Sequence, residues 1–149
     1  MFDIELKNSN EMTIRAKEKV VNINVAQSKI DAGLAVGELE GAGEYEIGDI
    51  VVSATDTREG GVMYRIDVDG IKIGLVGSGV KTEELDELGP IDILGTADAK
   101  VVSIVEPKIV IPMGNMDFSE VKASVKVEKK LKIKNANSLP TTLEVYKLD

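Results

Sequence analysis

Two Ser-x-x-Lys patterns, at 78–81 and 119–122, are candidate nucleophile–base pairs in this sequence. In such a pattern a desolvated lysine can take the proton of the serine hydroxyl, provided that a helix aligns the two side chains. Gly79 disfavours that helix in the first pattern. In the second pattern, Ser119 is better interpreted as a helix cap. We therefore expect neither serine to be catalytic.

Two short segments that contain glycine could bind ions. The segment 67–70, Asp-Val-Asp-Gly, resembles part of a calcium loop, but strands are expected on both sides of it, and a hairpin turn is the simpler interpretation. The segment 77–79, Gly-Ser-Gly, could present backbone N–H groups to an anion. It lacks the spacing of a P-loop, so we expect it mainly to turn the chain.

The residue types that are absent exclude several kinds of chemistry. The 149 residues include 0 His and 0 Cys, which excludes the usual zinc sites, Ser-His and Cys-His nucleophile pairs, and disulfides. Two acidic clusters could in principle supply the paired carboxylates of a glycoside hydrolase. Sugar-binding clefts commonly use aromatic side chains, which make up only 3% of the chain, so we expect both clusters to be solvated surface. The clusters are Glu38, Glu40, Glu44 and Glu46, and Glu83, Glu84, Asp86 and Glu87.

The charge of the chain argues against a nucleic-acid partner. Lys and Arg total 18 and Asp and Glu total 26, so the formal net charge is −8, whereas binding to a phosphate backbone needs a basic face. One basic stretch lies within 122–134 and has no interleaved aromatic residues for base stacking. Because it alternates with Val125, Val127, Leu131 and Ile133, we interpret it as an amphipathic strand with a solvated charged face.

The pattern of apolar residues predicts a single domain over 1–149 that consists mostly of strands. Hairpins are expected for 12–17 with 20–25 and for 62–68 with 71–76, the second around Asp69-Gly70. The five glycines within 33–48 favour short strands and turns. Later elements are expected in this order: a helix from Thr82 to Gly89-Pro90, a strand at 91–94, a helix from Thr96 or Asp98 to about Glu106, a strand at 109–112, a short helix beyond Ser119 and a last strand at 142–148.

No targeting or membrane segment is expected. Residues 1–7 alternate between apolar and charged residues, as in a strand, and the apolar run at 109–113 is far below the ~20 residues needed to span a bilayer. We therefore expect a cytoplasmic protein with no membrane partner.

Several of these segments, taken in order, resemble the metallo-β-lactamase superfamily, in particular the small metal-dependent hydrolases of the ascorbate-lactonase-like branch. The resemblance covers roughly the last two-thirds of the chain. The segments are Gly-Glu-Tyr-Glu at 43–46, the hairpin that ends in Leu-Val-Gly at 75–77, Thr-Glu-Glu-Leu-Asp-Glu-Leu-Gly at 82–89, Val-Glu-Pro-Lys-Ile-Val-Ile-Pro-Met at 105–113, and Lys-Leu-Lys-Ile at 130–133. The resemblance implies an α+β fold of the αββα sandwich type, here reduced in size, with two or three outer helices.

The same resemblance implies a metal site whose ligands this sequence does not have. The family's His-rich loop has no counterpart between Val25 and Gly43, and Asp56-Thr57 stand where the family usually has a His-Asp pair. Ser78 replaces the bridging Asp, and Gly114 replaces the final His. No metal ligand, cofactor or catalytic residue is therefore predicted. Without metal, Asp56, Thr57, Ser78, Gly114 and Asn115 are predicted to form a vestigial pocket.

Three functions follow from this interpretation. The first is a non-catalytic protein with a structural or protein-interaction role. The second is a metal-free binder of small ligands, chiefly anions, that uses the vestigial pocket. The third is a hydrolase in which carboxylates hold Mg, Mn or Ca. Because the shortened chain is expected to leave an apolar sheet face uncovered, we also predict a homo-oligomer, most simply a two-fold dimer.

Overall fold

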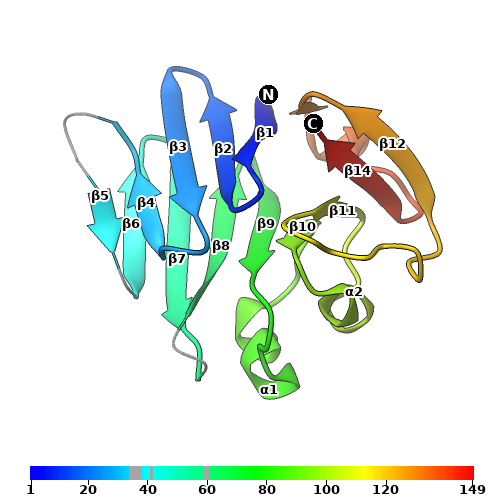
Figure 1. The fold of residues 1–149 in the computed structure, drawn as a ribbon. Helices are drawn as coiled ribbons and strands as arrows, with labels where there is room; N and C mark the ends of the chain where they lie inside the picture. The colour runs from blue at the N-terminus through cyan, green and yellow to red at the C-terminus, as the bar shows by residue number, and fades with distance from the viewer. Residues whose placement is uncertain (34–37, 41, 59–60) are drawn as a thin grey trace.

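Two β-sheets that pack face to face form the core of the protein (Figure 1). The computed structural model describes residues 1–33, 38–40, 42–58 and 61–149. Sheet A has the strand order β13-β1-β2-β3-β4-β5, and sheet B has the order β12-β14-β11-β10-β9-β8-β7-β6. The elements are β1 (Phe2–Asn8), β2 (Glu11–Ala16), β3 (Lys19–Asn24), β4 (Lys29–Asp31), β5 (Glu38–Glu40), β6 (Gly43–Ile47), β7 (Ile50–Asp56), β8 (Val62–Val68), β9 (Ile71–Val76), α1 (Thr82–Leu85), β10 (Ile93–Thr96), α2 (Ala99–Val105), β11 (Ile109–Pro112), β12 (Ser124–Glu128), β13 (Leu131–Ile133) and β14 (Glu144–Leu148), with 3-10 turns at Asp86–Leu88 and Ala136–Ser138.

Sheet A is built from hairpins, and most of its apolar residues face sheet B. Strands β1 to β4 alternate apolar and polar residues, and this period of two directs one face of each strand to the core. Side chains such as Ile4, Ile14 and Ile23 are fully buried between the sheets. The predicted hairpin of β2 and β3 is confirmed. The short strands predicted within 33–48 are confirmed in part by β5 and β6, while residues 34–37 and 41 lie outside the described residues.

The outer face of sheet A is polar, which corrects two expectations. Arg15 pairs with Glu5 at 2.7 Å, and the Thr13 hydroxyl donates to the Asn22 side chain. Because this face is polar, it can meet water directly, and neither α1 nor α2 contributes to the cluster that packs beneath it. Within the described residues, helices therefore cover sheet B alone, instead of both outer faces of an αββα sandwich. The uncovered face is not the apolar face on which the dimer prediction was based.

Sheet B joins an antiparallel half to a parallel half. Strands β7, β8 and β9 are antiparallel, and the predicted turn at Asp69-Gly70 is confirmed, with φ of 52° and 76°. From β9 onward the neighbours β10, β11 and β14 are parallel. The crossover from β10 to β11 contains α2, as predicted, and Asp98 caps this helix by accepting the backbone N–H of Lys100.

Side chains from α1, α2 and the segment 116–123 cover the outer face of sheet B. Leu85, Leu88, Val101 and Val102 pack there against Val76, Leu94, Val110 and Val145. The predicted helix at 82–89 is confirmed as α1 followed by a 3-10 turn. The helix predicted beyond Ser119 is wrong, because that stretch consists of turns and bends. No helix that the structure describes is both long and apolar enough to cross a membrane.

The alternating segment at 125–133 is two strands in different sheets instead of one amphipathic strand. Strand β12 lies at the edge of sheet B, and after Lys129-Lys130 the chain crosses to β13 at the edge of sheet A (Figure 1). Leu131 and Ile133 are buried, each 3% exposed, but Val125 and Val127 are 48% and 58% exposed. The predicted strand at 91–94 also begins later, at Ile93.

Candidate functional site

The carboxyl ends of four strands of sheet B lie along one edge, which we call the carboxyl rim. Strands β7, β9, β10 and β11 run in the same direction, so Asp56, Val76, Thr96 and Pro112 end at the same side of the sheet. In open α/β sheets, ligands bind preferentially beyond such strand ends. Each residue of the predicted vestigial pocket follows or ends one of these strands. The rim is therefore where that prediction has to be examined.

Turns of sheet A approach the carboxyl rim near Gly114. The backbone N–H of Gly114 donates to the carbonyl of Ser9, in the β1–β2 turn, at 2.9 Å. Val25, at the end of β3, donates to the carbonyl of Asn10 at 2.8 Å. Gly114 has a φ of +59°, a backbone conformation that glycine adopts at little cost. The chain thus has a structural reason for glycine at this position, independent of any lost ligand.

The predicted pocket residues form a row along the rim. Asp56 lies at the end of β7, Ser78 after β9 and Gly114 after β11. Strand β8 lies between β7 and β9, and β10 lies between β9 and β11. Four strand spacings of about 4.8 Å each place the ends of β7 and β11 about 19 Å apart. Asp56 and Gly114, at the two ends of the row, are therefore too far apart to line one small pocket. Two separate cavities lie along the row instead, and neither of them is lined by Ser78 or Asn115.

The first cavity, of about 320 Å³, lies beside the end of β7. It is lined by Asp56, Thr57 and Arg58 together with Glu83, Glu84 and Glu87 from the helical segment. Glu84 is 8% exposed, and its carboxylate accepts the backbone N–H groups of Arg58 at 2.8 Å and Lys81 at 3.2 Å. These hydrogen bonds, that of Arg58 first, lower the pKa of Glu84. The Glu84 carboxylate therefore links the chain at Arg58, after β7, to the chain at Lys81, before α1.

The second cavity, of about 480 Å³, lies between the β1–β2 turn and the end of β11. Lys7, Asn8 and Ser9 of sheet A and Gly114 and Lys147 of sheet B line it. Its apolar wall consists of Leu6, Pro112, Met116, Phe118 and Leu148, and Asp149 also borders it. Two ammonium groups near an amide and a hydroxyl could bind a small carboxylate or phosphate. Lys7 also approaches Glu11, at 3.8 Å, which offsets part of its charge.

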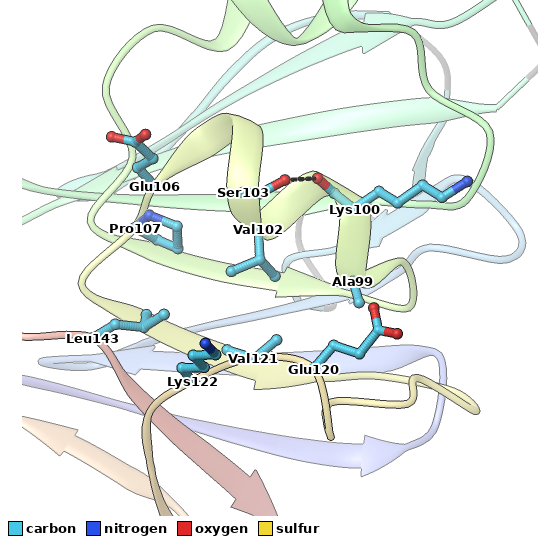
Figure 2. Close-up of a pocket in the computed structure, with 10 residues that line it drawn as sticks. All are labelled: Ala99, Lys100, Val102, Ser103, Glu106, Pro107, Glu120, Val121, Lys122 and Leu143. Atoms are coloured by element: carbon cyan, nitrogen blue, oxygen red, sulfur yellow. Dashed lines mark hydrogen bonds between the residues drawn. The ribbon is translucent and has the colours of Figure 1, made fainter.

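A third hollow, which the sequence analysis did not find, lies on the outer face of sheet B; we call it the α2 groove. It has a volume of about 600 Å³ and runs between α2 and the segment 120–122. Figure 2 shows Val102 pointing from α2 toward Val121, while Lys100 and Glu106 point away at the two ends of the helix. The apolar face of α2 was visible in the sequence. Its pairing with Val121 and Leu143 depends on tertiary structure, which no local pattern indicates.

Comparisons with known proteins identify the fold. No protein-family model matches the sequence, and no curated protein matches it. Among solved structures, it is similar to a candidate zinc-dependent hydrolase of the metallo-β-lactamase superfamily from Thermotoga maritima, with a TM-score of 0.71 over 100% of both chains at 13% identity. This chain has the metallo-β-lactamase fold. The resemblance read from the sequence is thus confirmed at the level of the fold.

The comparison corrects the prediction that the chain is not an enzyme. The protein with the same metallo-β-lactamase fold is a candidate hydrolase, and the structural match extends over the whole of both chains. The absence of His and Cys concerns one class of metal ligands. It does not show that catalysis has been lost, so the conclusion drawn from it was wrong.

The described side chains of this metallo-β-lactamase fold do not fit a zinc ion, such as a zinc-dependent hydrolase would need. No three His, Cys, Asp or Glu residues within the described ranges are grouped so that they could hold a metal ion. Asp56 is exposed, and Glu84 is held by two backbone N–H groups. The same observation leaves the carboxylate-bound Mg, Mn or Ca site without support from the described residues. We derive no step through a metal.

Proposed function

We propose that this chain is a protein-interaction module in which β12 receives an extended strand from a partner. The observation that carries the proposal is the exposure of Val125 and Val127, at 48% and 58%, on the outermost strand of sheet B. Exposed valines on an unpaired strand edge are a template for strand addition. Their exposure costs stability in an isolated chain, and a partner strand would bury them.

Strands β6 and β13 differ from β12 in the side chains that they expose. The outer strands of the described chain are β5, β6, β12 and β13. Strand β6 exposes Glu44 and Glu46, and β13 exposes Lys132 while it buries its two apolar residues. Charged side chains on an edge strand oppose pairing with another chain. Strand β12 also exposes Lys126 and Glu128, but it adds two exposed valines, which favours pairing there.

The backbone of β12 also directs its free hydrogen-bonding groups outward. The carbonyl of Glu128 accepts the N–H of Asp149 at 3.0 Å, so Glu128 directs its backbone groups toward β14. Alternate residues of a strand direct these groups to opposite sides. Ser124 and Lys126 therefore also face β14, whereas Val125 and Val127 direct N–H and C=O to the free edge. A partner strand would meet these groups directly.

Contacts on the inner face hold β12 in place for this role. Lys126 forms an ion pair with Glu144 at 3.3 Å, and its ammonium group lies 5.5 Å from the centre of the Tyr146 ring. Val125 pairs with Val145, which belongs to the cluster on the outer face of sheet B. The valines of β12 therefore extend the apolar outer face of the sheet to its edge.

A designed peptide tests this proposal without knowledge of the natural partner. The probe is acetyl-Thr-Val-Glu-Val-Glu-Val-Thr-amide, whose acidic residues suit the lysines that follow β12 and whose valines suit its apolar face. We expect chemical shift changes on addition of the peptide to centre on the amides of 124–128. A peptide with serine in place of valine is expected to cause none.

Variants locate the binding. The Val125→Lys/Val127→Lys double variant should abolish peptide binding, because it places charge on the free edge. The matched control is Val20→Lys, which changes an exposed valine (39%) on the inner strand β3 and should bind as the unchanged chain does. Shift changes that lie away from β12, or that survive the double variant, would show that the proposal is wrong.

The cavity between Lys7 and Lys147 favours a second candidate function, the metal-free binding of a small carboxylate or phosphate at the carboxyl rim. Lysines from both sheets line this cavity. A binder should show a melting temperature that rises with ligand concentration, and the Lys147→Gln variant should lose that rise. Succinate, benzoate and inorganic phosphate are suitable probes. The absence of any rise with all three would remove this candidate.

A further inference from the structure

We infer that the partner strand is β12 of a second copy of this chain, joined about a two-fold axis perpendicular to sheet B. This inference rests on the proposed function, since it names the partner of the same strand edge. Such an axis turns one β12 antiparallel to the other and keeps the outer face of each sheet on the same side. Two sheets B would then form one continuous sheet, with the valines of both copies on one face.

The charges of β12 favour one register, centred on Val127, which its free backbone groups permit. In this register Val127 faces Val127 of the second copy, and both residues direct their N–H and C=O groups across the interface. Lys126 then faces Glu128 of the second copy, and Glu128 faces Lys126. Opposite charges directly across an antiparallel pair are stabilising, and the symmetry provides this pair twice.

The neighbouring symmetric register, centred on Lys126, is less favourable. It would place Lys126 directly opposite Lys126 of the second copy, and like charges in that position are destabilising. In that register Val125 faces Val127 of the second copy, so backbone hydrogen bonds alone do not disfavour it. Charge complementarity therefore favours the register centred on Val127.

The interface is small, so the dimer should form only at high concentration. One five-residue strand from each copy makes the central contact, and stable complexes generally bury about 1,200–2,000 Å² in total. Sedimentation equilibrium over a wide range of concentrations should show a reversible change from 16.0 kDa toward twice that mass. A mass that stays at 16.0 kDa up to millimolar protein would overturn the inference.

Charge reversal tests the register itself. Lys126→Glu alone and Glu128→Lys alone should each weaken dimerisation about tenfold, because each turns both cross-strand pairs into like charges. A mixture of the two variants should restore association, because every pair in the mixed dimer is again opposite in charge. The single variants exclude the register centred on Lys126. In that register Glu128 faces Ser124 and each variant keeps two like charges at position 126, so neither variant should weaken dimerisation.

Two controls keep the result interpretable. Lys100→Glu and Glu106→Lys carry the same charge changes on α2, and their mixture should associate no better than either variant alone. Lys126 also pairs with Glu144, so the melting temperature of Lys126→Glu must show that it folds. If it does not fold, Val127→Lys provides the second route, since it should leave the chain monomeric at every concentration. A dimer that persists in Val127→Lys would place the interface elsewhere.

The results separate this inference from the proposed function. If the designed peptide binds at β12 while the chain remains monomeric, the interaction module stands and the second copy is not its partner. If the chain dimerises but mixing does not restore the charge-reversed variants, the register is wrong. If neither the peptide nor a second copy binds at β12, both proposals fail.

Discussion

A Cβ atom added at Gly95 would lie 3.0 Å from Cε of Met12, although the two residues belong to different sheets. The same Cβ would lie 2.7 Å from Cδ2 of Leu75 and 3.0 Å from Sδ of Met113. The sheets therefore approach so closely behind the carboxyl rim that position 95 has no room for a methyl group. Glycine at 95 reflects packing between the sheets.

Gly95→Ala should therefore destabilise the fold. Overpacking of a dense core typically costs about 1–3 kcal/mol in the free energy of unfolding, although flexible Met12 and Met113 can absorb part of the strain. Urea unfolding measures this as a lower midpoint at unchanged slope. Gly77→Ala is the matched control at the rim, since the nearest atom to its Cβ, Cγ1 of Val25, is 4.0 Å away. Equal destabilisation by both variants would contradict this account of the packing.

Local signals in the sequence predicted much of the fold. Asp69-Gly70 specified a hairpin because its turn needs positive φ at both positions, and both have it. Asp98 and Pro107 bounded α2, and the apolar run of β11 was predicted at its observed bounds. In each case the residues that determine the element lie within a few positions of it. The resemblance to the metallo-β-lactamase superfamily then predicted the two packed sheets, but it also predicted helices on both outer faces.

The features that were missed depend on contacts between distant segments. Val127 and Leu131 belong to the same alternating series of apolar residues. Val127 is nevertheless exposed and Leu131 is buried, because the chain changes sheets between them. The polar outer face of sheet A was likewise not expected, although the polar residues that alternate with apolar ones in β1 to β3 indicate it. The predicted site residues were assigned to a single pocket, while the strand order places them in a row.

Gly114→Ala should destabilise the protein by about 1 kcal/mol, since a residue with a Cβ is strained at positive φ. The φ of +59° is responsible and not a lack of space, because the atom nearest to the added Cβ is Cβ of Ala97 at 3.5 Å. Gly114→Asn should cost less, because asparagine tolerates this conformation better. Thermal unfolding of both variants checks the order. An alanine variant as stable as the unchanged chain would remove the structural reason for glycine here.

Glu84 should make stability depend on pH in the acid range. Its pKa is lowered from its ordinary value of 4.5 by the N–H groups of Arg58 and Lys81. A lowered pKa in the folded state means that the stabilisation is present above pH 4.5 and is lost as the pH falls through the folded value. Glu84→Gln should be less stable at neutral pH and should lose that part of the acid dependence. Urea unfolding at pH 7 and pH 3.5 measures it, with exposed Glu87→Gln as the control.

Tyr64 should make stability depend on pH in the alkaline range. The side chain is 1% exposed between the sheets, and its hydroxyl oxygen has no hydrogen-bond partner among the described residues. Burial raises the pKa of Tyr64 to about 12, and Tyr45 adds to the rise. The Ser28 hydroxyl, which does not meet the geometry of a hydrogen bond to Tyr64, opposes it. Because the folded value lies above the ordinary value of 10.0, stability should be complete below pH 10.0 and should fall as the pH rises toward 12.

Tyr64→Phe separates this effect from general alkaline unfolding. Removal of an unpaired buried hydroxyl should leave the free energy of unfolding at pH 7 unchanged or slightly higher, whereas loss of a hydrogen-bonded hydroxyl costs about 0.5–1.5 kcal/mol. Between pH 10 and pH 12 the phenylalanine variant should lose less stability than the unchanged chain. Tyr146→Phe, which alters a partly exposed tyrosine on β14, is the control. A large loss of stability for Tyr64→Phe at pH 7 would show that the hydroxyl is bonded in solution.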